Sequence, residues 1–161
     1  MRAAARETSS RRVTAIPMEY DYTTIDGLIF ALYDVISGPA GVEPNWRRER
    51  ELYAPGARLM PSRLLENGDL FSEILTVDDY IASRGPYLRE NAFYEREVSS
   101  KVDQYHQIAH VFSGYESSET PNGPPFSRGV NSIQLVQSQG RWWVQSILWL
   151  SEWRGERTGK T

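Results

Sequence analysis

The spacing of apolar residues changes along the chain and divides it into a helical half and a strand half. Before residue 92, apolar residues recur every three or four positions, which is the spacing of one face of a helix. After it they alternate with period two, as they do in strands. The first half predicts three helices, over residues 23–37, 44–57 and 76–91. Between the last two, residues 57–71 predict a hairpin around Asn67-Gly68, a strong two-residue turn signal.

Local residues set expected ends for these helices. Pro55 and the glycine after it should stop the second helix. The third begins with Thr76 and Asp79 at the spacing of a capping box, with Asp in place of the usual Glu. The Gly-Pro pair at Pro86 should break or bend this third helix.

The second half predicts four long strands joined by short links. They cover residues 92–105, 107–117, 127–137 and 141–151. Short links between such strands indicate an antiparallel meander. Helices followed by a meander indicate an α+β fold, with three N-terminal helices packed on one face of a curved antiparallel sheet.

The last strand is apolar on both faces. One face carries Trp142, Val144 and Leu148, and the other carries Trp143, Ile147 and Trp149. A sheet exposed to water on one side would show polar residues on that side. We therefore expect the helices to cover one face and a second copy of the chain to cover the other, which makes a homodimer.

Composition narrows the class of protein. The 161 residues suit one domain, which we place at residues 18–153 between flexible tails at 1–17 and 154–161. The net charge of −3 argues against a nucleic-acid partner. The absence of cysteine excludes thiolate chemistry, and two histidines cannot form an all-histidine metal site. No apolar run is long enough to span a membrane. The first 17 residues lack the apolar core of a signal peptide, and we interpret them as a tail rather than a transit peptide, so we expect a cytoplasmic protein.

Four stretches, in this order and spacing, carry a family resemblance: "TIDGLIFALYDVISG", "LYAPGARL", "VDQYHQIAHVFSGYES" and "RGVNSIQLVQSQGRWWVQSILW". The chain resembles the nuclear transport factor 2-like (NTF2-like) superfamily, which includes SnoaL-like polyketide cyclases and ketosteroid isomerases. Within it, the chain is most similar to a bacterial group without an assigned reaction. The resemblance implies a cystatin-like cone with a pocket between sheet and helices, and a dimer through the outer sheet face. It does not give the function, because this fold hosts enzymes, carriers and interaction modules.

The two histidines lie four residues apart but in different local settings. The hairpin position of His106 is commonly glycine in proteins of this kind, and histidine tolerates the left-handed backbone of such a turn. We therefore expect His106 to be an exposed turn residue, and we expect no metal site. His110 lies inside the next strand between Ile108 and Phe112. It is the one candidate for a base near neutral pH, and otherwise a core or interface histidine.

Several other side chains are candidate ligand contacts. Asn131 lies on an apolar strand face and must find a hydrogen-bond partner, which is either a ligand or a neighbouring residue. The same alternatives hold for Gln145. Aromatic residues on the elements around the expected pocket would supply its apolar wall. These candidates are Tyr33, Trp46, Tyr53, Tyr80 and Phe93.

Acidic residues are weaker candidates for a functional role. Glu95 and Glu97 lie on one strand face, either as a carboxylate pair with one raised pKa or as partners of Arg128 in a salt bridge, which we favour. Asp34 could orient His110. The charge run at residues 47–51, "RRERE", is typical of a solvated helix face.

Three functions remain open. The first is a pocket protein that binds a small apolar or aromatic molecule without a cofactor. The second is a cofactor-free lyase, isomerase or hydrolase that uses His110. The third is an interaction module whose cone is filled by its own tryptophans. No nucleotide-binding, nucleophile-elbow or zinc motif is present.

Overall fold

The computed structural model describes residues 19–153, so the two predicted tails lie outside the described residues. The helices are α1 (Ile25–Asp34), α2 (Trp46–Glu51) and α3 (Val77–Glu90). The strands are β1 (Tyr53–Leu64), β2 (Leu70–Ser72), β3 (Tyr94–Tyr105), β4 (Ile108–Ser118), β5 (Pro125–Ser138) and β6 (Arg141–Trp153).

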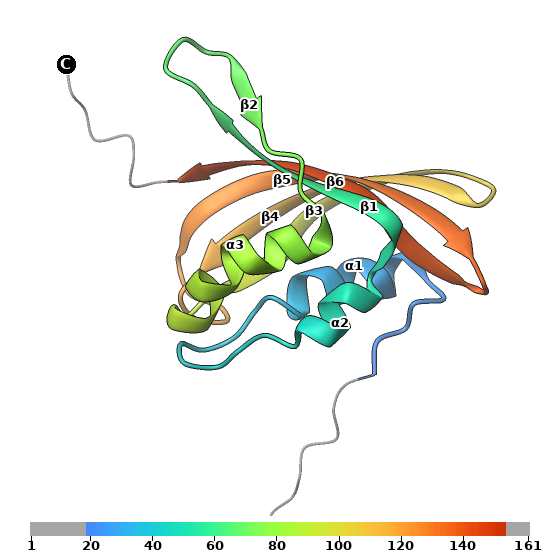
Figure 1. The fold of residues 1–161 in the computed structure, drawn as a ribbon, viewed down its shortest axis with the longest axis horizontal. Helices are drawn as coiled ribbons and strands as arrows, with labels where there is room; N and C mark the ends of the chain where they lie inside the picture. Colours follow the sequence, from blue (N-terminus) through green and yellow to red (C-terminus); the bar gives the residue numbers. More distant parts are fainter. Residues whose placement is uncertain (1–18, 154–161) are drawn as a thin grey trace, which may run out of the picture.

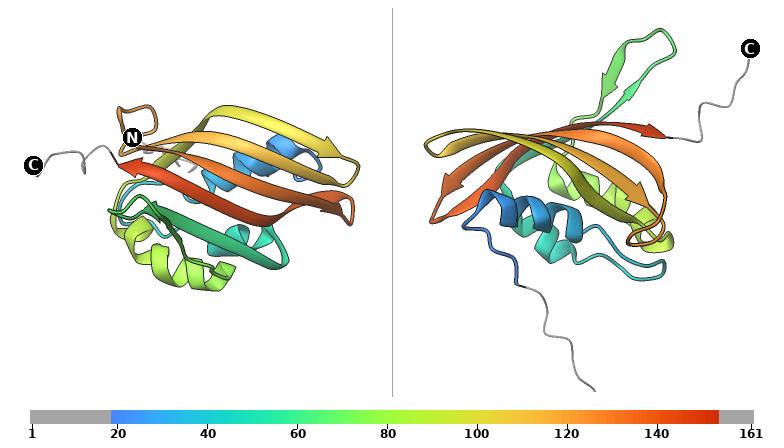
Figure 2. Two further views of the ribbon diagram at one scale, coloured as in Figure 1. Left: turned by 90° about the horizontal axis from the view of Figure 1, so that it is seen from above. Right: turned by 180° about the vertical axis from the view of Figure 1, so that it is seen from behind.

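One sheet of six strands, in the order β2-β1-β6-β5-β4-β3, forms the frame of the molecule (Figure 1). Strands β3 to β6 pair with their chain neighbours in antiparallel fashion, so the predicted meander is confirmed. The sheet curves, and the helices lie together on its concave side (Figures 1 and 2). The predicted α+β fold is therefore confirmed.

The core fills the space between α1 and the inner face of the sheet. Thr24 caps α1 by accepting a hydrogen bond from the Gly27 amide at 3.0 Å. Leu28, one turn later, is completely buried, as are Val111 and Ile133 on the sheet. The helical spacing in residues 23–37 thus reflects one buried stripe.

The edge of the sheet contains the predicted hairpin and one pairing that was not predicted. β1 pairs in parallel with β6, and it pairs in antiparallel fashion only with the short β2. The second helix is also shorter than predicted, because the strand begins at Tyr53, opposite Val144. Pro55 lies within the strand, at an irregularity where Gly56 takes a φ of 78°. The helix thus ends before Pro55, and the residues from Tyr53 onward belong to the strand that pairs with β6.

The third helix is not broken at Pro86, which was predicted to break or bend it. It runs on to Glu90 with Pro86 inside it. The carbonyl that loses its helical partner belongs to Ala82, which is exposed, so water can satisfy it. The capping box at its start is confirmed, with reciprocal bonds of 3.1 Å between Thr76 and Asp79.

Two turns connect neighbouring strands of the sheet. Leu64 pairs with Leu70, so the loop around Asn67-Gly68 spans residues 65–69, and the β1–β2 arm projects from the body of the domain (Figure 1). His106 has a φ of 49°, which confirms its place in the β3–β4 turn. Within residues 19–153, no helix has the length and apolar character needed to cross a membrane.

Candidate functional site

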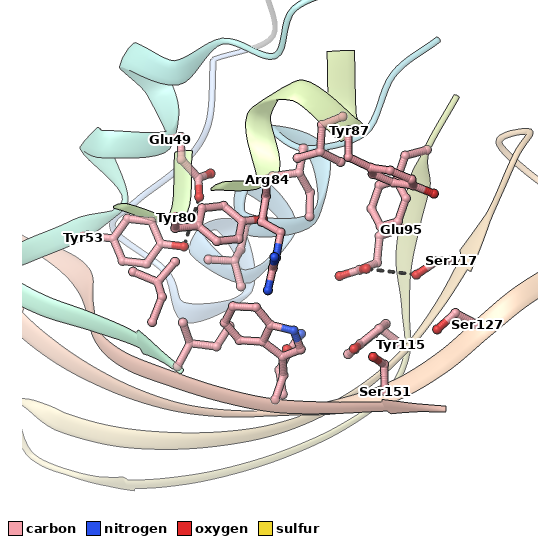
Figure 3. A pocket seen from close by; sticks show the side chains of 18 residues that line it. Glu49, Tyr53, Tyr80, Arg84, Tyr87, Glu95, Tyr115, Ser117, Ser127 and Ser151 are labelled. Carbon is pink, nitrogen blue, oxygen red and sulfur yellow. Dashed lines mark hydrogen bonds between the residues drawn. The ribbon is translucent and has the colours of Figure 1, made fainter. Parts of the chain in front are cut away.

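A cavity of about 170 Å³ lies between the inner face of the sheet and the helices (Figure 3). Aromatic and aliphatic side chains form much of its wall. The Tyr80 ring of α3 meets the Trp149 ring of β6 edge to face, with centroids 6.0 Å apart and planes at 86°. Tyr53 and Phe93 add two more rings. The cavity is therefore an apolar chamber with a few polar groups.

Glu49 is the most unusual of these polar groups. It lies on α2, and only 1% of its surface is exposed. Its Oε1 accepts a hydrogen bond of 3.2 Å from the Tyr53 hydroxyl, whereas its Oε2 has no hydrogen-bond partner among the described residues. Burial raises the pKa of Glu49 from 4.5 to about 7, and the bond from Tyr53 offsets only part of this. A buried carboxyl group with one free oxygen therefore borders the cavity.

Glu95 of β3 is a second acidic group on the cavity wall (Figure 3). Its Oε2 accepts a hydrogen bond of 3.0 Å from the Ser117 hydroxyl. Burial raises the pKa of Glu95 from 4.5 to about 7, and the Ser117 bond opposes the rise. This carboxyl group can therefore gain or lose a proton near neutral pH.

The salt bridges expected at Glu95 and Glu97 are not formed, which corrects the favoured interpretation. Among the described residues, Arg128 pairs instead with Glu116, at 2.7 Å. Glu97 accepts a hydrogen bond from Ser113. The reason lies in the direction of the side chains: Glu95 turns inward to the cavity, out of reach of the outer-face pair Arg128 and Glu116.

A buried hydrogen-bond chain stands behind one wall of the cavity. Asn131 of β5 lines the cavity and donates from Nδ2 to the Tyr33 hydroxyl at 2.9 Å. The Tyr33 hydroxyl also meets Ser113 Oγ at 2.6 Å, and Ser113 donates onward to Glu97. Burial raises the pKa of Tyr33 well above its usual value, so its hydroxyl stays protonated. Asn131 thus has a partner in the protein itself.

Four of the predicted ligand contacts meet at the cavity, and four lie elsewhere. Tyr53, Tyr80, Phe93 and Asn131 line it. Tyr33 lies behind Asn131, and the Trp46 ring packs over Gly85, 3.4 Å from where a Cβ would sit. His110 and Gln145 line a separate surface groove.

His110 lies on the outer face of the sheet and does not face the cavity. Its neighbours on that face, Ile108 and Phe112, are 58% and 52% exposed. Its Nε2 lies 2.9 Å from Ser132 Oγ. Asp34, on α1 at the opposite face, instead accepts a hydrogen bond from Tyr20. The structure therefore does not bring Asp34 and His110 together.

No protein-family model matches this sequence, and no curated protein matches it. Solved structures do match in fold. A protein of unknown function with a cystatin-like fold, from Nostoc punctiforme PCC 73102, aligns with a TM-score of 0.60 and 9% identity, over 80% of this chain and 88% of that one. An NTF2-like protein of unknown function from Silicibacter pomeroyi DSS-3 aligns with a TM-score of 0.52 and 14% identity, over 80% and 92%. The chain has the NTF2-like fold.

A third structure with the NTF2-like fold is a candidate ketosteroid isomerase from Shewanella frigidimarina NCIMB 400. It aligns with a TM-score of 0.51 and 16% identity, over 76% of this chain and 91% of that one. At these identities the likeness concerns the fold alone, so the chemistry of the cavity has to be argued from its own residues.

Sequence reasoning missed Glu49, because a glutamate within "RRERE" reads as part of a solvated face. A signal was present in the spacing. Glu49 lies three residues after Trp46 and four before Tyr53, so all three share one side of a helical turn. Arg50, the next residue, points outward and pairs with Asp78 at 2.8 Å.

Proposed function

We propose that the protein binds a small, largely apolar molecule, about one aromatic ring in size, in the cavity between the sheet and the helices. The observation that carries this proposal is an open volume of about 170 Å³ with rings on its wall. An apolar cavity of roughly 150 Å³ holds one benzene molecule. A single ring with a small substituent therefore fits.

The third function, a cone filled by tryptophans, has less support. Trp142 is buried in the core, and Trp149 forms part of the cavity wall. Trp143 lies on the surface under the Arg141 guanidinium, whose central carbon is 3.7 Å from the centre of the Trp143 ring. The three rings therefore leave the cavity open, which favours a ligand over an interaction module of this kind.

Toluene titration tests the binding proposal. We expect toluene to bind the wild-type protein, as measured by chemical-shift changes of cavity residues. Ile147→Phe places extra volume in the cavity wall and should weaken toluene binding by about tenfold or more. Leu148→Phe is the matched control, because this neighbour lies on the outer face and is 36% exposed. Circular dichroism establishes that each variant is folded.

The proposal fails if toluene, phenol and indole all leave the wild-type spectrum unchanged at millimolar concentration. It also fails if a folded Ile147→Phe variant binds toluene as well as Leu148→Phe does. Should Ile147→Phe not fold, Ser127→Val offers a smaller reduction of the same cavity, since Ser127 lines it and is buried.

A second candidate function is cofactor-free acid–base catalysis, with Glu95 in the role that we had assigned to His110. It is favoured by one observation: the Glu95 carboxyl lines the cavity and has a pKa of about 7. Such a group can remove a proton from a carbon next to a carbonyl. Deuterium exchange into cyclohexanone, followed by NMR, should then depend on the protein and be lost in Glu95→Gln. Equal exchange with and without the protein would exclude this function for that probe.

We also propose a homodimer through the outer sheet face. Phe112, Ile108 and Leu148 are 52%, 58% and 36% exposed on this side of the sheet, and none of the helices within residues 19–153 covers it (Figures 1 and 2). Exposed apolar patches of this kind mark interaction sites. The superfamily resemblance supports a second copy of the chain as the partner. A cytoplasmic location stays a prediction.

Light scattering tests the dimer. The wild-type protein should have about twice the chain mass of 18.4 kDa, and Phe112→Glu should reduce the mass to that of one chain. Val42→Glu is the control, because Val42 is 55% exposed in the α1–α2 loop, on the helix side. A wild-type monomer at micromolar concentration would refute the proposal.

A further inference from the structure

Glu49, which lines the cavity, has an unused hydrogen-bond acceptor. Its side chain is buried, its Oε1 is bonded to the Tyr53 hydroxyl, and its Oε2 has no partner among residues 19–153. A buried carboxyl oxygen without a partner is costly, so such groups in folded proteins are normally satisfied by protein, water or ligand. The free oxygen of a group that lines the cavity is therefore a site for a ligand atom.

The charges around the cavity indicate what kind of ligand atom would bind at this oxygen. Two carboxyl groups, those of Glu49 and Glu95, line it. Arg84 also lines it, but its guanidinium pairs at 3.3 Å with Glu73, in a partly exposed ion pair. The acidic groups thus exceed the available positive charge, which disfavours an anionic ligand and favours a cation.

Aromatic rings strengthen this preference. Tyr80 lies within electrostatic reach of both Glu49 and Glu95, since burial and then these two negative charges raise the pKa of its hydroxyl. Its ring stands edge to face against Trp149. Aromatic faces attract organic cations, most strongly where water is excluded. The cavity therefore combines carboxylate oxygens with π faces, a combination that suits a protonated amine.

We infer that the cavity selects a small organic amine, about one ring in size, whose protonated nitrogen donates a hydrogen bond to Oε2 of Glu49 while its apolar part lies against Tyr80 and Trp149. This inference rests on the proposed function, because it names the ligand class of the same cavity. Glu49 is the residue that sets the specificity, and the rings supply the apolar contact.

Three molecules of similar size separate the possibilities: benzylamine, benzyl alcohol and toluene. Calorimetry or NMR titration of the wild-type protein near pH 8 should give an affinity for benzylamine at least about tenfold above that for benzyl alcohol. Glu49→Gln keeps the shape of the side chain and removes its charge, so it should abolish this preference while toluene still binds. Glu51→Gln is the matched control, two residues away on the same helix, half-exposed and outside the cavity.

Binding should also depend on pH in a definite direction. The nitrogen of benzylamine is protonated at neutral pH, whereas Glu49 must be ionised to accept from it. Affinity for benzylamine should therefore rise between about pH 5.5 and pH 8, and affinity for toluene should stay nearly constant. The other titratable or charged groups that line the cavity with Glu49 are Tyr53, Tyr80, Arg84, Tyr87, Glu95 and Tyr115. Glu95→Gln removes the other cavity carboxyl, whose pKa burial also raises to about 7.

The possible results distinguish a failure of the amine inference from a failure of the proposed function. If toluene binds and benzylamine binds no better than benzyl alcohol, the amine inference is wrong and the proposed function stands. A folded Glu49→Gln variant that keeps the preference also overturns it. If none of the three molecules binds, the proposed function itself fails. Should Glu49→Gln not fold, the rise of benzylamine affinity with pH in the Glu95→Gln protein decides the matter, and a flat profile refutes the inference.

Discussion

Replacement of Glu49 by glutamine should change the way in which stability depends on pH. In the folded, ligand-free protein, burial raises the pKa of Glu49 from 4.5 to about 7. The folded state therefore holds a proton more tightly than the unfolded state does. A raised carboxyl pKa contributes stability that is fully present below pH 4.5 and is lost as the pH rises through about 7.

The size of the effect follows from the two pKa values. The difference between 4.5 and about 7 is about 2.5 pH units, and each unit corresponds to 1.36 kcal/mol. Ionising Glu49 in place should thus cost the folded state about 3 kcal/mol by pH 8. Glutamine carries no titrating proton, so Glu49→Gln should become more stable relative to wild type by about this amount between pH 4.5 and pH 8. Domains of this size have total stabilities of about 5–15 kcal/mol, so the change is easily measured.

Urea unfolding, followed by tryptophan fluorescence at several pH values, measures this change. The quantity of interest is the free energy of unfolding of Glu49→Gln minus that of wild type at each pH, because the titration of Glu95 and of the surface carboxyls largely cancels in the difference. Glu51→Gln should run parallel to wild type, since the Glu51 side chain is 45% exposed. Parallel curves for Glu49→Gln and wild type, within about 1 kcal/mol over this range, would refute the account of a buried, protonated carboxyl.

Three further substitutions test the packing around the site, each by urea unfolding at neutral pH. Tyr33→Phe removes the acceptor of the Asn131 amide and should lower the free energy of unfolding by about 1–3 kcal/mol; an effect below about 0.5 kcal/mol would show that Asn131 finds another partner. Gly129→Ala places a Cβ in overlap with the Tyr115 hydroxyl and 2.6 Å from the Leu150 carbonyl oxygen, so it should destabilise by about 1–3 kcal/mol; an unchanged unfolding midpoint would contradict this close approach. Thr76→Ala removes the cap of α3 and should cost about 1 kcal/mol, whereas Thr120→Ala, outside any helix, serves as its control.

Much of the fold could be predicted from the sequence, because the hydrophobic period is a local property. The change from helical to alternating spacing near residue 92 marks the start of the meander. The errors arise where a distant partner decides the local structure. Pro55 lies in a strand because β6, about ninety residues later, pairs with β1. Nothing near Pro55 in the sequence reveals that partner.

The candidate site was less predictable, for a related reason. Alternation shows that Ile108, His110 and Phe112 share one strand face, but it does not show which face the helices cover. Both faces are rich in apolar residues, so His110 and Asn131 were equally good candidates for the cavity. Asn131 faces inward because its strand neighbours on that side, Ile133 and Leu135, pack under the helices.

The orientation of Glu49 is fixed by its neighbours on the six-residue helix α2. Arg48 lies over the Tyr20 ring, 5.0 Å from its centre, and Arg50 pairs with Asp78 on α3 at 2.8 Å. Trp46 packs over Gly85 of the same α3 helix. These contacts on both sides set the rotation of α2, and a helix so held cannot turn Glu49 outward without losing them.

A buried carboxyl group that served only packing would be better replaced by an apolar residue, because an unpaired acid at this place destabilises the fold at neutral pH. The chain instead keeps Glu49 in a run of charged residues whose arginines point outward and hold it in place. Strained or costly groups of this kind are found chiefly at binding and catalytic sites, where a ligand supplies the missing partner. An amine in the cavity would lower the pKa of Glu49 on binding, so saturating benzylamine should remove most of the loss of stability between pH 4.5 and pH 8 in the wild-type protein. Saturating toluene, which offers no donor, should raise stability by the same amount at every pH, and an equal response to both molecules would show that Glu49 takes no part in binding.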